Sequence, residues 1–168
     1  MNIPPFTLDR QYSEIGSQIE HAVLEVLQGG QFIGGREVAK FERSFASLIN
    51  VKNVISCNSG TDALVLGLRA LDIGVGDEVI TSSFSFFATA EAINIVGATP
   101  VFIDINPETL LIDLDKIESQ ISSRTKAIMP VHLFGNSVNM TRLKSIAEKY
   151  QLKIIEDCAQ ATCTMWQN

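Results

Sequence analysis

Apolar residues in the first fifty positions recur at the spacing of an α-helix. Between Ser13 and Gly30 they occupy positions 15, 19, 22, 23, 26 and 27, and a second apolar stripe runs through Arg36–Ile49. Ser13 is a suitable N-cap for the first helix, and Gly30 can end that helix in a left-handed turn. The pattern therefore predicts an N-terminal helical arm over residues 1–50.

After residue 50 the pattern changes to short β-branched runs that alternate with helical stretches. The predicted strands are Asn53–Cys57, Glu78–Ser82, Thr99–Ile105, Thr125–Gly135 and Leu152–Asp157, and the predicted helices are Thr61–Asp72, Ala88–Gly97, Asp113–Ile121 and Thr141–Tyr150. This alternation is typical of an α/β domain, here residues 51–168, with a mostly parallel sheet and helices on both faces. Ligands of such domains collect at the carboxyl ends of the strands.

Composition and charge narrow the classes of partner. The chain has 168 residues and a formal net charge of −6, without basic runs, which argues against nucleic acid and anionic membrane surfaces as partners. The N-terminus lacks the features of a secretory signal, and the longest apolar stretch is too interrupted for a transmembrane helix. The three cysteines, Cys57, Cys158 and Cys163, form no CxxC pair. They indicate reduced thiols in a cytoplasmic protein, and we expect Cys57 and Cys158 to be small core residues.

The first candidate for chemistry is the segment CNSGTDAL, which joins a predicted strand to its helix. Gly60 lets the backbone approach a ligand, and the helix start offers unpaired N–H groups, so Gly60, Thr61 and Asp62 form a candidate phosphate site. The alternative is a plain capping box, because Ser59 and Asp62 match [ST]-x-x-[DE]. Neither GxGxxG nor GxxxxGK[ST] occurs, which disfavours a dinucleotide site or a P-loop.

Three further candidate binding positions lie near the carboxyl ends of other predicted strands. Phe86 could stack on a planar ligand or belong to the core, and His132 could face a substrate or be a hydrogen-bonded structural residue. Glu156 and Asp157 are adjacent in a strand, so their side chains point to opposite faces. We expect Asp157, followed by Gln160, to face the ligand edge.

Together these residues suit a flat, phosphorylated heterocycle with a ring nitrogen, such as pyridoxal phosphate. The order FIGGREVAKFE, CNSGTDALVLGLRAL, GVGDEVITSSFSFFATAEAI, TKAIMPVHLFGN and IIEDCAQA resembles the DegT/DnrJ/StrS family of nucleotide-sugar aminotransferases. The resemblance implies a fold-type I pyridoxal-phosphate enzyme.

The resemblance also implies a role for each candidate residue. Gly60, Thr61 and Asp62 would hold the cofactor phosphate, and Phe86 would take the stacking position. Asp157 would hydrogen-bond the pyridine nitrogen and keep it protonated. Gln160 would reach the side of the ring that carries the 3-hydroxyl. The reaction implied is amino transfer from glutamate, through pyridoxamine phosphate, to a keto-sugar on a nucleoside diphosphate, by a cytoplasmic homodimer serving polysaccharide or amino-sugar biosynthesis.

The sequence departs from the family pattern in two places. Relatives carry a Schiff-base lysine in a downstream motif resembling SFxxTKxLG, and none of the seven lysines here occupies such a motif. We therefore expect an incomplete large domain, without its downstream strands and small domain, that is inactive alone. Cys163 stands where relatives commonly have a glycine, so we expect a positive φ there.

Other readings remain open from the sequence. A pyridoxamine-dependent sugar 3-dehydratase, which replaces the lysine by histidine, would look the same over these residues. A non-catalytic cofactor-binding or interaction module is a second alternative, and a flavodoxin-like nucleotide binder is a third.

Overall fold

The computed structural model of the chain describes residue 4 and residues 6–167, and it divides into two compact units, Met1–Ser56 and Cys57–Asn168. The boundary predicted at residue 50 lies inside the first unit.

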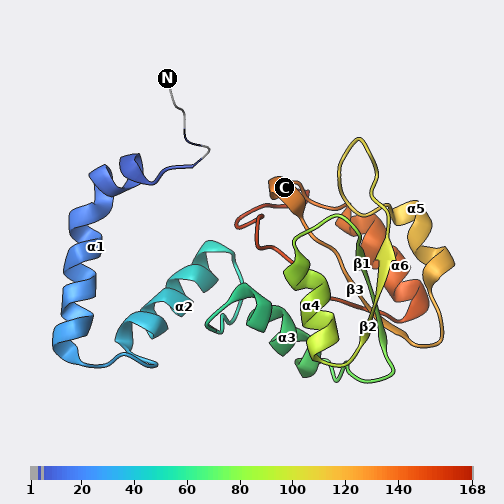
Figure 1. Ribbon diagram of the computed structural model, residues 1–168, viewed down its shortest axis with the longest axis horizontal. Helices are drawn as coiled ribbons and strands as arrows, with labels where there is room; N and C mark the ends of the chain where they lie inside the picture. Colours follow the sequence, from blue (N-terminus) through green and yellow to red (C-terminus); the bar gives the residue numbers. More distant parts are fainter. Residues whose placement is uncertain (1–3, 5, 168) are drawn as a thin grey trace. The chain divides into compact units, whose positions relative to one another are not determined.

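The first unit contains two helices, α1 (Asp9–Gly29) and α2 (Arg36–Leu48) (Figure 1). The predicted cap at Ser13 is wrong, because α1 begins four residues earlier and the Ser13 hydroxyl donates to a carbonyl within the helix. The predicted left-handed end is confirmed, since Gly30 has φ +66° and its N–H donates to Val26.

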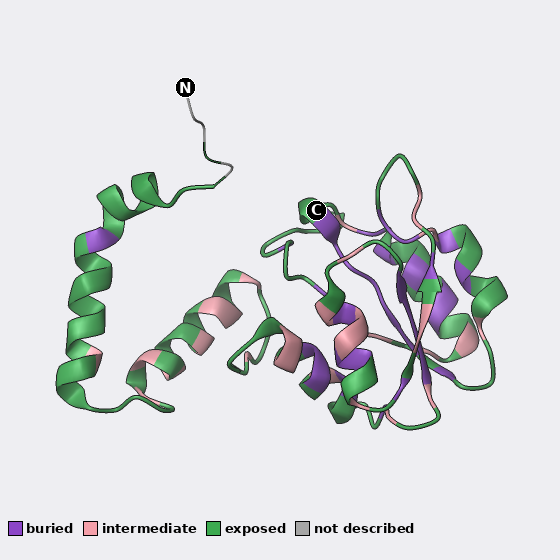
Figure 2. Ribbon diagram, in the orientation of Figure 1, coloured by how far each residue is buried: buried purple, intermediate pink, exposed green. Residues whose placement is uncertain are grey.

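Apolar side chains of this unit lie largely in solvent, and Figure 2 shows both helices as mostly exposed. The exposed apolar residues of α1 and α2 include Ile15, Ile19, Val23, Leu24, Leu27, Val38, Phe41 and Leu48. Each helix is amphipathic but covers little of its apolar face within the unit. Among the described residues, no helix is both long and apolar enough to cross a membrane.

The strand predicted over Asn53–Cys57 is wrong. The described residues of this segment form no strand, and Ile55 is 83% exposed. One hydrogen bond of this segment joins the Ser56 N–H to a carboxylate oxygen of Glu42 at 2.8 Å. A β-branched run forms a strand only where a neighbouring strand completes its hydrogen bonds, and none of the four described strands pairs with this segment.

The second unit alternates strands and helices. Its elements are α3 (Gly60–Ala70), β1 (Glu78–Ser82), α4 (Phe87–Ile95), β2 (Thr99–Ile103), α5 (Leu114–Ile117), the 3₁₀ turn η1 (Glu118–Gln120), β3 (Thr125–Met129), the 3₁₀ turn η2 (Leu133–Gly135), α6 (Met140–Tyr150) and β4 (Lys153–Ile154). The strands form one parallel sheet in the order β2-β1-β3-β4. The predicted α/β architecture with a parallel sheet is confirmed.

Successive residues of the central strands face opposite layers of helices. Val79 of β1 and Ala127 of β3 pack in one apolar cluster with α3 and α4, whereas Ile80 and Ile128 pack in another with α5 and α6. Figure 1 shows the two pairs of helices on opposite sides of the sheet. All four strand residues are fully buried, so the sheet is covered on both faces as its sequence pattern predicts.

Pairing between the β3 and β4 regions continues beyond the regular strands. The Ile155 N–H donates to Ile128, the Asp157 N–H donates to Pro130 at 2.9 Å, and the His132 N–H donates back to Asp157 at 3.1 Å. The longer strands predicted for Thr125–Gly135 and Leu152–Asp157 therefore end early as regular strands. Their paired continuation places Asp157 at the carboxyl edge of the sheet.

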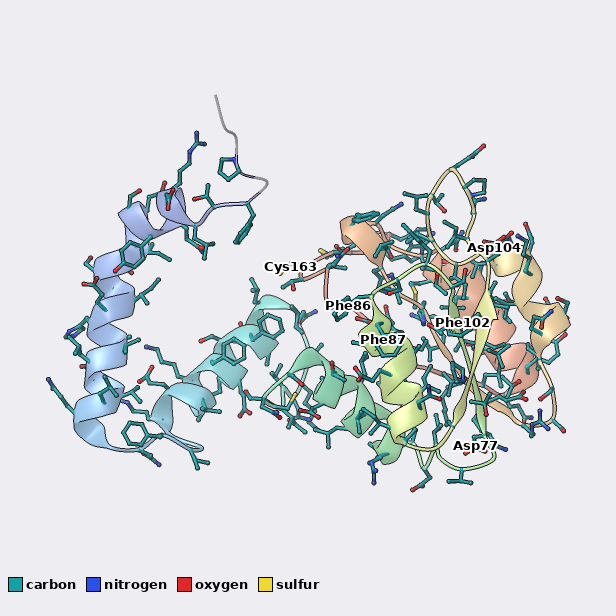
Figure 3. All side chains as sticks on the ribbon, in the orientation of Figure 1. Asp77, Phe86, Phe87, Phe102, Asp104 and Cys163 are labelled. Atoms are coloured by element: carbon teal, nitrogen blue, oxygen red, sulfur yellow. The ribbon has the colours of Figure 1, made fainter. Side chains whose placement is uncertain are left out.

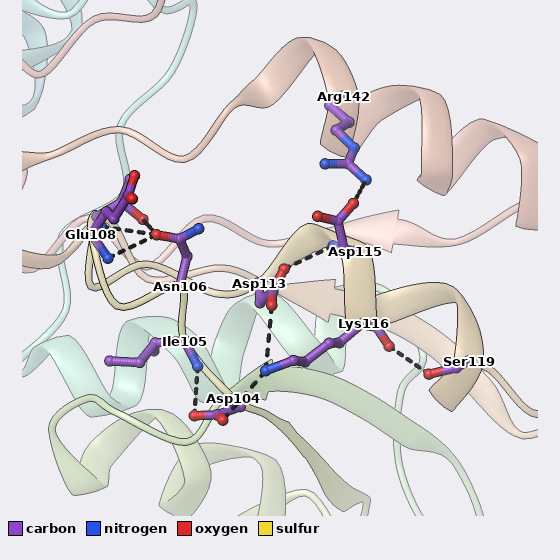
Figure 4. A network of polar contacts seen from close by, with 10 residues as sticks. Asp104, Ile105, Asn106, Glu108, Asp113, Asp115, Lys116, Ser119 and Arg142 are labelled. Carbon is purple, nitrogen blue, oxygen red and sulfur yellow. Dashed lines mark hydrogen bonds and ion pairs between the residues drawn. The ribbon is translucent and has the colours of Figure 1, made fainter.

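A network of charged side chains fixes the connection from β2 to α5 and α6 (Figure 4). The Lys116 ammonium lies 3.4 Å from carboxylate oxygens of both Asp104 and Asp113, and Arg142 of α6 pairs with Asp115. Asp113 also caps α5 by accepting the Asp115 N–H at 3.0 Å. The network ties this long connection to the helix layer opposite α3 and α4.

Candidate functional site

A cavity of about 340 Å³ opens at the carboxyl edge of the sheet. Its lining comes from the start of α3, the β1–α4 connection with the start of α4, and the segments after β3 and β4; the residues are Gly60, Thr61, Ala63, Leu64, Ser85, Phe86, Ala88, Thr89, Val131, Leu133, Glu156, Asp157, Cys158, Ala159 and Gln160. The volume lies in the range of small-molecule sites, roughly 300–1,000 Å³. The cavity brings together five of the seven predicted site residues and leaves out Asp62 and His132.

Asp157 provides the buried carboxylate of the cavity. The residue is 7% exposed, and one carboxylate oxygen accepts the Thr89 hydroxyl at 2.8 Å while the other accepts the Ala159 N–H at 3.2 Å. Ser85 lies 3.3 Å from the Thr89 hydroxyl and extends the chain of polar contacts. Because both oxygens of the Asp157 carboxylate accept a hydrogen bond from the protein, the orientation of the carboxylate is fixed. A carboxylate with a fixed orientation suits recognition of one hydrogen-bond donor on a ligand.

The start of α3 provides backbone donors. Ser59 is the N-cap, and its hydroxyl accepts the Asp62 N–H at 3.1 Å and donates to the Asp62 carboxylate at 2.9 Å. The Ser59 half of the capping box is thus present, and it occupies the Asp62 N–H that was predicted to face a phosphate. Within the part of the chain that the structure describes, the N–H groups of Gly60 and Thr61 have no acceptor. These two donors at the positive end of the helix dipole can bind an anion.

Phe86 and Gln160 lie on the wall of the cavity. Phe86 is the N-cap residue of α4 and is 78% exposed, so it does not belong to the core (Figure 3). Gln160 is anchored by its side-chain oxygen, which accepts the Phe134 N–H at 2.9 Å. Its amide nitrogen has no acceptor among the described residues, so the side chain can still donate to a ligand.

His132 lies behind the cavity and not on its wall. The residue is 3% exposed; Nδ1 accepts the Val138 N–H at 3.1 Å, and Nε2 lies 2.9 Å from a Glu156 carboxylate oxygen. Both ring nitrogens are used within the protein, which favours the structural alternative over direct contact with a substrate. The bond from His132 lowers the pKa of Glu156, and the positive charge of Lys144 adds a smaller effect.

The cysteines do not occupy the predicted core positions. Cys57 and Cys158 are exposed, so the expectation of small core residues is wrong. Cys158 lines the cavity, and partial burial of its thiol, followed by the charges of Glu156 and Asp157, raises its pKa. The thiol therefore stays protonated at neutral pH and is a weak nucleophile. Cys163 has φ +64°, so the expected positive φ is confirmed.

Sequence reasoning missed Thr89 and Ser85. Thr89 is 68 positions from Asp157 in the chain and comes to its carboxylate only because α4 lies beside the sheet edge. A threonine within a helix carries no signal of its own for such a role. The sequence pattern indicated only Phe86 in the segment that also contains Ser85 and Thr89.

Comparison with known proteins shows the family to which the chain belongs. Residues 13–168 match the model of the DegT/DnrJ/EryC1/StrS aminotransferase family. The chain belongs to this family. A family member from Aneurinibacillus thermoaerophilus, dTDP-3-amino-3,6-dideoxy-α-D-galactopyranose transaminase, is 51% identical over 144 residues, which are 86% of this chain and 40% of that protein.

Solved structures of the DegT/DnrJ/EryC1/StrS family share the fold. DesV of S. venezuelae, in complex with a ketimine intermediate, has a TM-score of 0.93 and 38% identity over 95% of this chain and 43% of its own. NtdA of Bacillus subtilis, with bound cofactor PMP, has a TM-score of 0.91 and 40% sequence identity, and the match covers 95% of this chain and 37% of the NtdA chain. The chain thus spans about two fifths of the length of these relatives. The predicted fold of a pyridoxal-phosphate enzyme of type I is confirmed.

The described residues fit such a cofactor. The cavity offers two free N–H groups at the start of α3, an exposed aromatic ring at Phe86 and a buried carboxylate at Asp157, groups whose chemistry suits a phosphate, a planar ring and a protonated ring nitrogen in turn. None of the cavity residues named above is a lysine. The described residues therefore offer non-covalent contacts to the cofactor.

Proposed function

We propose that this chain binds pyridoxal phosphate or pyridoxamine phosphate in the cavity at the carboxyl edge of the sheet. The observation that carries the proposal is the buried Asp157 carboxylate, held by Thr89 and Ala159 in the same cavity as the free N–H groups of Gly60 and Thr61. A cofactor of this class also accompanies the B. subtilis structure described above.

Each group has a distinct part in binding. The Gly60 and Thr61 N–H groups and the Thr61 hydroxyl hold the phosphate, and Phe86 covers one face of the ring. Asp157 accepts a hydrogen bond from the ring nitrogen, and Gln160 donates to the side of the ring that carries the hydroxyl. Asp62 contributes by shaping the helix start through the Ser59 cap.

The cofactor supplies a cationic ring that takes up electrons when the Cα proton of an amino substrate departs. The contribution of this chain is electrostatic, because the Asp157 carboxylate stabilises the positive charge on the ring nitrogen. Thr89 and Ala159 fix both carboxylate oxygens, so little reorganisation is needed as the reaction proceeds.

In a protein that carries these residues together with the remaining length of its relatives, we propose amino transfer from glutamate to a nucleotide-linked keto-sugar. A B. subtilis relative with 44% identity over 84% of this chain is a 3-oxo-glucose-6-phosphate:glutamate aminotransferase, and the A. thermoaerophilus relative acts on a dTDP-sugar. We propose further that the active protein is a homodimer, in which a second copy covers exposed apolar side chains of α1 and α2.

The 168 residues alone should bind the cofactor without turnover, since the residues that line the cavity include no lysine. The test is calorimetric titration of the chain with pyridoxamine phosphate. The Asp157→Asn variant keeps an oxygen for Thr89 but loses the charge, and we expect about 10- to 100-fold weaker binding from losing a charge-assisted hydrogen bond. Asp72→Asn, on the exposed turn after α3, is the matched control and should leave the affinity unchanged. Equal affinity of Asp157→Asn and the unaltered chain would refute the assignment.

One structural relative supports a second candidate activity. GDP-4-keto-6-deoxymannose-3-dehydratase, with a trapped PLP–glutamate geminal diamine, has a TM-score of 0.82 and 28% identity over 89% of this chain and 40% of its own. Both activities would use the same contacts in residues 57–168, so cofactor binding does not separate them. Product analysis of a protein with the full length of the relatives does: an amino-sugar supports the transaminase, and a deoxy-sugar supports the dehydratase. Absence of any cofactor binding by the chain would favour an interaction module.

A further inference from the structure

His132 and Glu156 form a side-chain pair whose purpose the cofactor contacts do not explain. The His132 ring is buried, and its Nδ1 accepts the Val138 N–H at 3.1 Å. Since Nδ1 is the acceptor, the neutral ring carries its proton on Nε2, which then donates to the Glu156 carboxylate at 2.9 Å. The backbone of the β3–α6 connection therefore selects the tautomer.

The pair involves the segment that carries Asp157, and Glu156 is itself one of the residues that line the cavity. Glu156 and Asp157 are adjacent in extended backbone, so their side chains point to opposite faces. On one face Glu156 bonds His132, and on the other face Asp157 bonds Thr89 of α4. Fixing one side chain of such a pair fixes the rotation of the segment, and hence the direction of the other side chain.

Backbone hydrogen bonds also join the segment that carries His132 to the segment that carries Asp157. The Asp157 N–H donates to Pro130 at 2.9 Å, and the His132 N–H donates to the Asp157 carbonyl at 3.1 Å. Residues 130–132 thus hold residues 156–157 by two backbone bonds and by the side-chain bond to Glu156. The side-chain bond is the one that a substitution can remove without a change to the backbone.

From this arrangement we infer that His132 is a positioning residue for Asp157. As the Nε2–H tautomer it fixes the Glu156 side chain and thereby keeps the adjacent Asp157 carboxylate directed at Thr89 in the cavity. His132 acts through Glu156 and makes no contact with the ligand. The cofactor-directed part of this role rests on the proposed function, whereas the hold on the Asp157 backbone does not.

A metal site is the competing interpretation of the same residues. The ligating atoms of His132, Glu156 and Cys158 lie within 4.8 Å of one another. A metal ion at Nε2 needs a lone pair there, which would place the ring proton on Nδ1 against the Val138 N–H. The hydrogen bonds of the ring therefore favour the positioning role, and Zn²⁺ becomes an arm of the test.

Two substitutions separate the two nitrogens of His132. In His132→Asn the side-chain oxygen takes the place of Nδ1 and the donor to Glu156 is lost. In His132→Gln the amide nitrogen reaches the place of Nε2 and the donor is kept. We expect His132→Asn to weaken pyridoxamine phosphate binding about tenfold, the effect of losing one hydrogen bond of about 1.4 kcal/mol. His132→Gln should restore most of the affinity.

Glu156→Ala tests the same bond from its other partner, and its half-exposed position makes it a safe variant for folding. It should weaken binding as much as His132→Asn, and the double variant should be no weaker than either single one. His21→Asn, on exposed α1, is the matched control and should change nothing. Additive losses in the double variant would overturn the inference, because the two residues would then act separately.

Hydrogen exchange at the Asp157 amide provides a readout that needs no cofactor. His132→Asn and Glu156→Ala should each speed exchange at this amide about tenfold, and His132→Gln should not. If the unaltered chain bound no pyridoxamine phosphate, the proposed function would fail while the exchange data still decided the positioning role. Unchanged exchange in both variants would overturn it. So would an Nδ1–H tautomer of His132 in long-range ¹⁵N spectra, or 1:1 Zn²⁺ binding that His132→Asn abolishes.

Discussion

The hydrogen bond from Thr89 to Asp157 offers a quantitative test of how the site is built. Thr89 is 2% exposed, and its hydroxyl lies 2.8 Å from a carboxylate oxygen of a residue that is itself buried. Thr89→Val exchanges the hydroxyl for a methyl group of nearly the same size. The change therefore removes a donor from a buried charge and leaves the packing almost as it was.

The loss of unfolding free energy expected for Thr89→Val depends on the hydrogen-bond partners that Asp157 keeps. Hydrogen bonds to charged groups contribute about 1.5–3 kcal/mol. In Thr89→Val, Asp157 keeps the Ala159 N–H at 3.2 Å on its other oxygen, so the charge is not left wholly without a partner. Ser85 also loses its 3.3 Å neighbour but is only partly buried and can turn to water. We expect the free energy of unfolding of the second unit to fall by about 2 kcal/mol.

Urea unfolding followed by the fluorescence of Trp166, the single tryptophan, measures this change in the second unit. With a slope of about 1–3 kcal/mol per molar urea, the midpoint should fall by about 1 M. Thr162→Val, at an exposed position without a side-chain hydrogen bond in the described structure, is the matched control and should move the midpoint little. A Thr89→Val midpoint within about 0.2 M of the unaltered chain would show that Thr89 does not hold Asp157.

Three further predictions use the same unfolding assay. Gly97→Ala should destabilise by at least about 1 kcal/mol, because Gly97 has φ +86° and an added Cβ would lie 2.7 Å from a Val75 methyl carbon; a neutral result would contradict the turn. Cys163→Gly should stabilise by up to about 1 kcal/mol by relieving φ +64°, and Cys163→Ala should not. Glu156→Gln should flatten the loss of stability in acid. The lowered pKa of Glu156 contributes stability above pH 4.5 that disappears as the pH falls through the folded-state pKa, by at most about 1 kcal/mol for a half-exposed group. Parallel pH profiles of variant and unaltered chain would count against the His132 bond.

The alternation of short β-branched runs with helical stretches was enough to predict the sheet, because this order is typical of parallel strands covered by helices on both faces. It failed at Asn53–Cys57, where β-branched residues are present but no described strand lies beside them. Strand propensity is local, whereas strand formation requires a partner. The helix ends show the same contrast, since Gly30 ends α1 as predicted but Ser13 does not begin it.

The candidate site was predicted only in part, because local sequence patterns do not show which distant residues the fold brings together. The alternation of side chains along a strand predicts that Asp157 and Glu156 point to opposite faces, and in the structure they are bonded to different partners, Thr89 and His132. The partners themselves lie 68 and 24 positions away, and only the packing of α4 and the pairing after β3 bring them close. Sequence patterns mark the edge where a site forms but not the polar contacts that orient it.

The central claim is that Asp157 binds the ring nitrogen of the cofactor and keeps it protonated. The most direct measurement is the ¹⁵N chemical shift of pyridoxamine phosphate labelled at the ring nitrogen, bound to the chain at a pH where the free ring nitrogen is neutral. We expect a protonated nitrogen with the unaltered chain and a neutral one with Asp157→Asn, at saturating ligand in both. A neutral ring nitrogen in the unaltered chain, or a protonated one in Asp157→Asn, would contradict the account.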